Sequence, residues 1–507
     1  MTRLYVLVIS LLAFSAFVSA QHHDTAASST AGPVDLGTID FPTSGPADAQ
    51  KHFVEGVLLL HSFEFARARR AFQESSRIAP DFAMAYWGEA MTYDHRIWGE
   101  QDRPSAVASL ARLAPSATER RAKAPTEREK MYLDAVEKLY LDGDELQVAS
   151  AYSTAMAALA KRFPDDVEAQ AFYSLSILGL TGTVRNTENY TMAAAVAETI
   201  YKKNPKHPGA LHYLIHSYDD PEHAAMGLTA ARAYGTVARS ASHAQHMPSH
   251  IFFALGLWED SINSNTAAMK TARDEGGGGY HPLFWLVYAY LQVGKTDDAA
   301  KLIATLEDDT KKPSSSPAAR TALAMSRATF IVETRGANFE SMMQTVDLGG
   351  IKSQGVFAGH DLAVGLEYAR RKDVAAAGRM LESIRSRSVS MKAAKSTVDS
   401  ASRYSNVSQG DLDTVSVMEN ILSAAIEFAS GGKEKGCRDM IAAARTEDKL
   451  IFEYGPPAIV KPAWEAAGEL LLASDRKKEA ADAFRSALKR YPNRRLSNEG
   501  LKAALAQ

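Results

Sequence analysis

Histidine is concentrated in one part of this chain. Eight of its 14 histidines fall within residues 207–281, where an even spread would place about two: His207, His212, His216, His223, His243, His246, His250 and His281. His212 and His216 are four residues apart, as are His246 and His250, so each pair shares one face of a helix. Imidazole binds zinc, copper, nickel and iron in proteins. The spacing therefore indicates a transition-metal site.

We predict that one divalent ion, zinc, copper, nickel or iron, binds among five of these side chains. The expected ligands are His212, His216, His243, His246 and His250. The two pairs lie about thirty residues apart, which places them on consecutive helix hairpins whose inner faces can converge. An open coordination position would allow hydrolytic or redox chemistry, although no residue can be assigned a catalytic role.

Other side chains could line the same site. The candidates are His61, Glu89, His95, Asp219, Asp220 and His281. Carboxylates could bind the ion or hold histidine tautomers by hydrogen bonding. Pro248 either opens a helix, leaving His243 and His246 on a loop, or bends a continuous one.

A purely structural explanation competes with the metal site. Helical histidine is often a hydrogen-bonded core or rim residue, which suits His207 and His223 better than ligation does. Asp220 followed by proline is also an ordinary helix start, with the aspartate as the cap.

Other kinds of chemistry leave no trace in the sequence. It contains no P-loop, no Gly-x-Ser-x-Gly, no Cys-x-x-Cys and no dinucleotide-binding fingerprint. The formal net charge of −3 provides no basic excess for nucleic acid. The single cysteine, Cys437, excludes an internal disulfide, so stability must come from packing.

The elements that must position the histidines are predicted to be helices. Two stretches share one pattern of small, aromatic and proline residues: Gly56, Ala68, Phe72 and Pro80 near the start, and Gly468, Ala480, Phe484 and Pro492 near the end. Small residues let two helices approach closely, the aromatic ring fills the space between pairs, and proline ends the second helix. The pattern predicts an all-α, tetratricopeptide-like helix-hairpin solenoid of about seven to ten helix pairs.

The predicted organisation has five parts. They are a signal peptide at 1–20, a flexible leader at 21–46, an N-terminal solenoid with the histidines at 47–308, a linker at 309–320 and C-terminal repeats at 321–507. Arg3, the apolar run after it and the small residues before Gln21 predict cleavage after Ala20. The mature chain is therefore expected in the periplasm or outside the cell, with no transmembrane segment.

Three strings carry a resemblance to a known family: FAMAYWGEAMTY at 82–93, HPGALHYLIHSYDDPEH at 207–223 and HAQHMPSHIF at 243–252. They resemble a largely uncharacterised family of exported bacterial tetratricopeptide repeat proteins. The resemblance implies the repeat fold and export, and it carries no activity over to this chain. The chain departs from the family at Arg96, where proline is usual, and at Phe284, where an acid is usual.

Two functions from different classes fit these observations. The first is a scaffold that binds a protein or peptide partner in the concave groove of the solenoid. The alternative is a metal-binding protein or metalloenzyme centred on the histidines. The metal content of the purified protein distinguishes the two.

Overall fold

A computed structural model describes residues 35–95, 97, 100–180, 186–346, 354–397, 407–452 and 454–506. The predicted signal peptide and most of the leader lie outside these residues. The N-terminal helices are α1 (Ala47–His61), α2 (Phe65–Ile78), α3 (Ala83–Met91), α4 (Arg103–Leu113), α5 (Ala117–Lys123), α6 (Glu127–Leu139), α7 (Glu145–Arg162), α8 (Val167–Leu178), α9 (Thr187–Lys203), α10 (Pro208–Tyr218), α11 (Ala224–Val237), α12 (Ser242–His246), α13 (Pro248–Leu255) and α14 (Trp258–Asp274).

The chain continues with α15 (Tyr280–Gln292), α16 (Thr296–Lys311), α17 (Pro317–Glu333), α18 (Phe339–Met342), α19 (Gln354–Arg370), α20 (Val374–Thr397), α21 (Gln409–Ala429), α22 (Lys433–Glu447), α23 (Ala463–Ala473), α24 (Lys477–Arg490) and α25 (Arg495–Leu505). Two-residue strands β1 (Asp94–His95) and β2 (Glu100–Gln101) pair antiparallel. None of the described helices has both the length and the apolar character needed to cross a bilayer.

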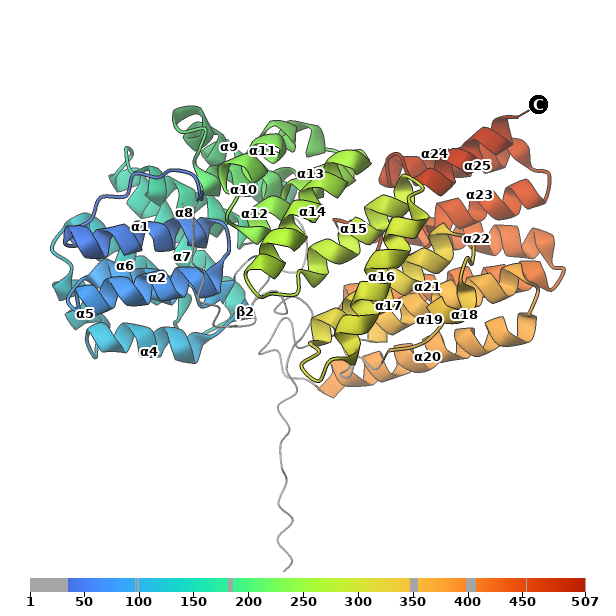
Figure 1. Ribbon diagram of the computed structural model, residues 1–507, viewed down its shortest axis with the longest axis horizontal. Coiled ribbons are helices and arrows are strands. Elements are labelled where there is room, and N and C mark those ends of the chain that lie inside the picture. The colour runs from blue at the N-terminus through green and yellow to red at the C-terminus, as the bar shows by residue number, and fades with distance from the viewer. Residues whose placement is uncertain are drawn as a thin grey trace, which may run out of the picture.

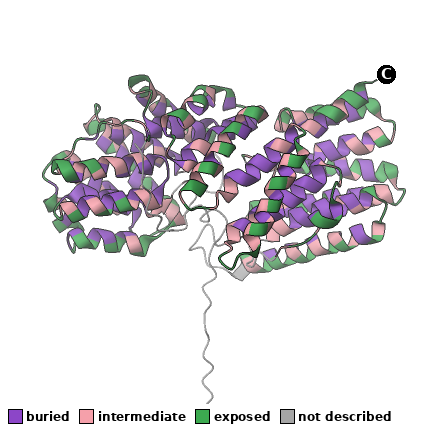
Figure 2. Ribbon diagram, viewed as in Figure 1, coloured by how far each residue is buried: buried purple, intermediate pink, exposed green. Residues whose placement is uncertain are grey.

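Consecutive helices pack as hairpins, and the hairpins stack side by side (Figure 1). Buried residues lie on the faces that helices turn toward one another, while exposed residues face outward (Figure 2). The fold is the predicted all-α, tetratricopeptide-like solenoid of helix hairpins.

The two clearest repeats show why the sequence folds this way. Phe72 of α2 is fully buried, and a Cβ added at Gly88 would come within 2.2 Å of its ring. Phe484 of α24 is buried in the same manner, and a Cβ at Gly500 would approach its ring to 2.3 Å. Only glycine leaves room for these rings, so the helices pack close together around them.

Trp464 lies four residues before Gly468 in the C-terminal repeat and is less buried than Phe484. Its ring is only partly buried, and its indole Nε1 donates to Asp448 Oδ2 at 2.9 Å. Because its polar edge is satisfied near the surface, it contributes less to the packing between pairs than Phe484 does. Cys437 is buried on α22, as its small apolar character suggests.

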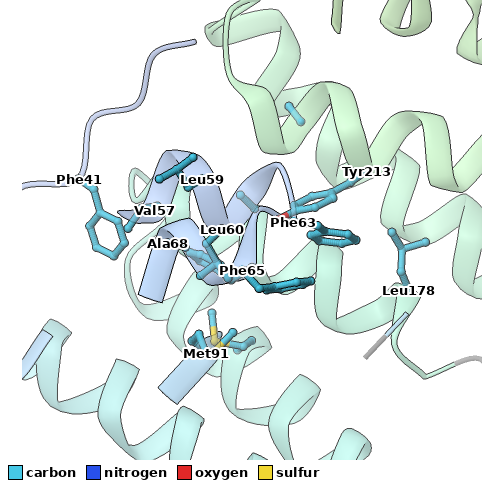
Figure 3. Packing of buried hydrophobic residues seen from close by; sticks show 14 of the residues in the cluster. Phe41, Val57, Leu59, Leu60, Phe63, Phe65, Ala68, Met91, Leu178 and Tyr213 are labelled. Atoms are coloured by element: carbon cyan, nitrogen blue, oxygen red, sulfur yellow. The ribbon is translucent and has the colours of Figure 1, made fainter. Parts of the chain in front are cut away.

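The core is divided in two within α13 and α14. One cluster of buried residues runs from Leu36 to Ala254 and the other from Phe253 to Ala504. Figure 1 shows the corresponding lobes, with α1–α14 on one side and α16–α25 on the other. Figure 3 shows part of the first cluster around α1 and α2, including Val57, Leu60 and Phe65.

The predicted linker at 309–320 is not a boundary between the lobes. Helix α16 continues to Lys311, and α17 begins at Pro317 with Ser316 as its cap. The serines and prolines that suggested a linker instead form a short turn between two helices that pack together.

Residues 35–46 were predicted as the end of a flexible leader, and that expectation is wrong for this stretch. Leu36 and Phe41 are each only 2% exposed, and Thr38 N donates to Lys206 O at 3.0 Å. The guanidinium of Arg128 also lies 4.7 Å from the centre of the Phe41 ring. The two apolar side chains anchor an otherwise polar segment to the first lobe.

Candidate metal centre

Four helices bring six histidines together. Helix α10 carries His212 and His216, α12 carries His243 and His246, α13 carries His250, and α15 begins with Tyr280 followed by His281. Helix α15 follows Gly279, whose φ of 60° permits the sharp entry that sets the start of the helix.

Pro248 bends the chain between α12 and α13. It is the first residue of α13, while Met247 before it keeps helical angles of φ −52° and ψ −37°. Pro248 therefore opens a helix, which is one of the two geometries that the sequence allows. His243 and His246 lie on a short helix rather than on a loop.

The six histidines form two sets rather than one. The first set is His212, His216 and His243, and the second set is His246, His250 and His281. Within each set, one donor atom from each residue lies within 4.8 Å of the others. The prediction of five ligands around a single ion is therefore wrong in its grouping, because His243 and His246 of α12 join different sets.

In the second set, two histidines direct unprotonated nitrogens at each other. His246 Nδ1 lies 2.7 Å from Asn265 Oδ1, and Asn265 is oriented by its own amide donating to Ser261 O. His250 Nδ1 lies 3.2 Å from Asp219 Oδ2. Both acceptors require the proton on Nδ1, so in the neutral rings the two Nε2 atoms present lone pairs. These Nε2 atoms are 3.2 Å apart.

The third member closes this set. His281 Nε2 lies 3.0 Å from His246 Nε2. Two nitrogens bound 2.0–2.1 Å from a tetrahedral ion would be about 3.3 Å apart. The observed separations of 3.0 and 3.2 Å are close to that value, so the set has the size of a metal site.

Burial keeps these imidazoles neutral. It lowers the pKa of His212 to about 3 and that of His246 to about 4. Burial, together with neighbouring histidines, also places the pKa values of His250 and His281 well below 6.5. At neutral pH a proton does not bridge the facing nitrogens, which leaves their lone pairs available to a metal ion.

Aromatic side chains cover the second set. The ring of Trp285 stacks on His250 with centroids 4.7 Å apart and meets His246 edge-on at 4.8 Å. Tyr454 lies between α22 and α23 of the second lobe, and its ring centre is also 4.7 Å from that of His250. A Cβ at Gly455 would come within 2.3 Å of Trp285, so the loop before α23 approaches the indole closely.

A third set contains a carboxylate and has a different character. Glu168 accepts from His61 Nε2 at 2.7 Å and from His207 Nε2 at 3.1 Å, and all three are fully buried. His207 Nδ1 accepts from Ala210 N, while His61 Nδ1 pairs with the Tyr213 hydroxyl at 2.8 Å. Each ring nitrogen thus has a hydrogen-bond partner. This set holds α1, α8 and α10 together and leaves no donor directed at an ion.

The remaining candidates have structural roles. Glu89 pairs with Arg112 and Gln73. His95 stacks on Phe65 with ring centres 3.9 Å apart. Neither belongs to a histidine set.

The aspartates of the motif divide between two roles. Asp220 accepts from the backbone N–H of Glu222 and of His223 in the turn before α11. The cap residue of α11 is His223, without a side-chain cap bond, so Asp220 is not the helix cap that the sequence suggested. The ring of His223 also pairs with Asp220, so this histidine is structural. Asp219, in contrast, orients His250 in the second set.

Sequence reasoning missed several side chains that hold the site. Asn265, Trp285 and Tyr454 lie outside the histidine strings, and their residue types give no signal of their own. Glu168 lies 39 residues before its partner His207. Only the three-dimensional stacking of hairpins brings these residues to the histidines.

Comparisons with known proteins give similarity only among solved structures. No protein-family model matches the chain, and no curated protein matches it in sequence. The TPR domain of P58(IPK) is 12% identical over 90% of this chain and 97% of that chain, with a TM-score of 0.22. Yeast Tom70 is 9% identical over 90% of this chain and 88% of that chain, with a TM-score of 0.30. The APC/C hetero-tetramer Cut9–Hcn1 is 11% identical over 91% of this chain and 97% of that chain, with a TM-score of 0.29. Such similarities are too low to bear on function.

Proposed function

We propose that this protein binds a divalent transition-metal ion through His246, His250 and His281. The observation that carries the proposal is the pair of Nε2 atoms of His246 and His250, 3.2 Å apart with their protons held on Nδ1. Two buried lone pairs at this distance repel each other unless a cation lies between them. A metal ion bound by both nitrogens removes that repulsion.

The surroundings of the second set also suit a metal ion. Asp219 and Asn265 accept from the ligand histidines and thereby fix the tautomer and ring orientation that coordination needs. The ligands are neutral imidazoles without thiolate, which suits zinc, copper, nickel and iron. Three protein ligands leave one position open on a four-coordinate ion, as in catalytic zinc sites.

Metal analysis tests the proposal directly. Untagged protein is purified without chelator, its metal content is measured, and the stripped protein is titrated with zinc, copper, nickel and iron ions in turn. Wild-type protein should bind metal stoichiometrically, whereas the double variant His246→Ala/His250→Ala should lose the ion of the second set.

His360→Ala is the matched control. His360 is also buried on a helix, but its Nε2 lies 3.2 Å from the backbone oxygen of Met342 and it belongs to no histidine set. This variant should retain the wild-type metal content. Equal metal uptake by wild type and the double variant would remove the basis for the proposal.

A protein-interaction scaffold is the second candidate, and the length of the solenoid favours it. The six histidines occupy α10–α15 alone, whereas the helices from α16 to α25 form a second lobe with its own core. Stacked hairpins offer long surfaces to a protein or peptide. Light scattering under native conditions tests this: a complex heavier than the 54.9 kDa chain that persists in His246→Ala/His250→Ala supports it. A lone chain in both proteins contradicts it.

We also propose that the chain is exported. The support is the charged start, apolar run and small residues that precede Gln21. N-terminal sequencing of the protein from its producing cells should find Gln21 first. A soluble chain that retains Met1 would contradict export.

A further inference from the structure

The first set has no role in the site proposed above, although all three of its histidines are buried, whereas His281 of the second set is not. We infer that His212, His216 and His243 bind a second metal ion, and that the two sets together form one dinuclear centre. This inference rests on metal binding by the second set. It adds a site, a stoichiometry and a physical interaction between two ions.

The first set has the features of a ligand group. His212 Nδ1 donates to the backbone oxygen of His61 at 2.7 Å, which places the lone pair of the neutral ring on Nε2. That Nε2 lies 3.2 Å from His243 Nε2. His216, one helical turn after His212, has its ring centre 4.7 Å from that of His212. The three residues are at most 7% exposed.

One buried carboxylate lies beside this set without bonding to its rings. Glu64 is the acid bonded to His243, but it accepts from the backbone N–H and not from the ring. Phe63 packs against all three imidazoles, with ring centres 4.3 to 5.8 Å away. An apolar ring therefore lies against the three imidazoles and limits the access of solvent to an ion bound there.

The two sets touch each other. The ring centre of His216 is 6.1 Å from that of His250, and the ring centre of His243 is 6.3 Å from that of His246. His243 and His246 are only three residues apart on α12, so one turn of helix serves both sets. Two ions held by rings in such contact are neighbours within a single buried centre.

The chemistry of the centre follows from its ligands. Six neutral imidazoles bring no negative charge to two divalent ions, and each ion keeps an open coordination position. A small anionic or polar ligand from solution, such as hydroxide or water, is the kind of molecule that would complete both coordination spheres. The class of cofactor is thus a pair of first-row transition ions suited to nitrogen ligands.

Copper titration of the stripped full-length protein tests the pairing. The number of tightly bound Cu²⁺ ions is determined, and the electron paramagnetic resonance intensity per bound ion is followed through the titration. We expect two equivalents, with an intensity per ion that falls as the second equivalent enters, because neighbouring spins couple.

The copper titration has three outcomes that would contradict the proposals to different extents. Two equivalents with strictly additive intensity would overturn the dinuclear pairing. A single equivalent would overturn the second site while leaving the proposed metal-binding function in place. No tight binding would overturn both.

A conservative variant gives a second readout. His216→Asn should bind one equivalent of Zn²⁺ where wild type binds two, because the second set remains intact. His360→Asn, at a buried histidine outside the sets, should still bind two. If His216→Asn does not fold, the copper measurement on wild-type protein still decides the inference. Two equivalents in a folded His216→Asn would overturn the role given to that residue.

Discussion

Glu168 is a fully buried carboxylate that binds two histidines at once. Burial by itself raises the pKa of Glu168, but His207 and His61 outweigh it and lower the pKa to about 2. The ionised carboxylate can therefore accept both imidazole N–H groups. Through His61, whose backbone oxygen accepts from His212, this interaction also supports the first histidine set.

Replacing Glu168 tests this role. In Glu168→Gln, one of the two imidazole N–H groups should face an amide donor, which costs about 1–3 kcal/mol for an unsatisfied buried group. The free energy of unfolding, measured with urea, should fall by this amount. Glu188→Gln on the exposed first turn of α9 should change it by about 0.5 kcal/mol or less.

Metal uptake distinguishes the set of His61, Glu168 and His207 from the two histidine sets proposed to bind metal. The folded fraction of Glu168→Gln should take up as much metal as wild type, since Glu168 belongs to the fully hydrogen-bonded set. A loss of metal without a loss of stability would show that Glu168 acts as a ligand instead.

At the residue scale, the sequence predicts which histidines come together but not how they divide. Spacing of four residues correctly pairs His212 with His216 and His246 with His250. The separation of His243 from His246 depends on the bend at Met247 and Pro248, which allows neighbouring turns to face different partners. Hydrogen-bond partners such as Asn265 lie on other helices. The spacing of histidines in the sequence does not determine how those helices are aligned with the site.

At the element scale, the glycine-and-phenylalanine pattern predicts both the hairpins and their close contact. If Trp464, which lies four residues before Gly468 in the repeat, had a fully buried ring, Trp464→Ala would cost roughly 3–5 kcal/mol. The observed ring is partly exposed, so that assumption fails. Spacing identifies which face of a helix packs inward, but not how completely a neighbouring element covers it.

Replacing Phe484 by alanine should lower the free energy of unfolding more than replacing Trp464 does. Phe484→Ala should lower the free energy of unfolding by roughly 3–5 kcal/mol, because the ring is fully buried between Gly468 and Gly500. Trp464→Ala should lower it by about 1–2 kcal/mol. Urea unfolding followed by circular dichroism compares the two variants. Equal losses would contradict the difference in burial.

At the scale of the whole molecule, the C-terminal repeats return to the middle of the chain. Trp258 Nε1 donates to Asn493 O at 3.0 Å, and Arg494 donates to the Tyr288 hydroxyl at 2.7 Å. These contacts join residues more than 200 positions apart. No periodicity in the sequence predicts them, because each depends on the accumulated curvature of many hairpins.

Arg494 is the centre of this long-range contact. It is fully buried and pairs with Glu465 of α23 at 2.8 Å and with Glu333 of α17 at 2.5 Å. Burial raises the pKa of Glu333. Burial also acts to raise that of Glu465, but Arg494 and Lys461 outweigh it and lower the pKa to about 2. Of the two carboxyls, Glu465 is the one that stays ionised into acid.

Glu465→Gln removes the carboxylate that pairs with Arg494. At neutral pH this variant should lose roughly 3–5 kcal/mol of unfolding free energy, because Arg494 keeps its buried charge and loses a partner. The folded pKa is lowered from 4.5 to about 2, so the unfolded state binds more protons between these values. The contribution of Glu465 is complete above pH 4.5 and declines as pH falls toward 2. The difference in unfolding free energy between wild type and variant, measured with urea, should therefore narrow over this range.

Glu469→Gln, at a side chain that is 40% exposed on the same helix, should show a smaller difference from wild type at neutral pH. A difference for Glu465→Gln that stays constant down to pH 2 would show that Glu465 is not held ionised by Arg494.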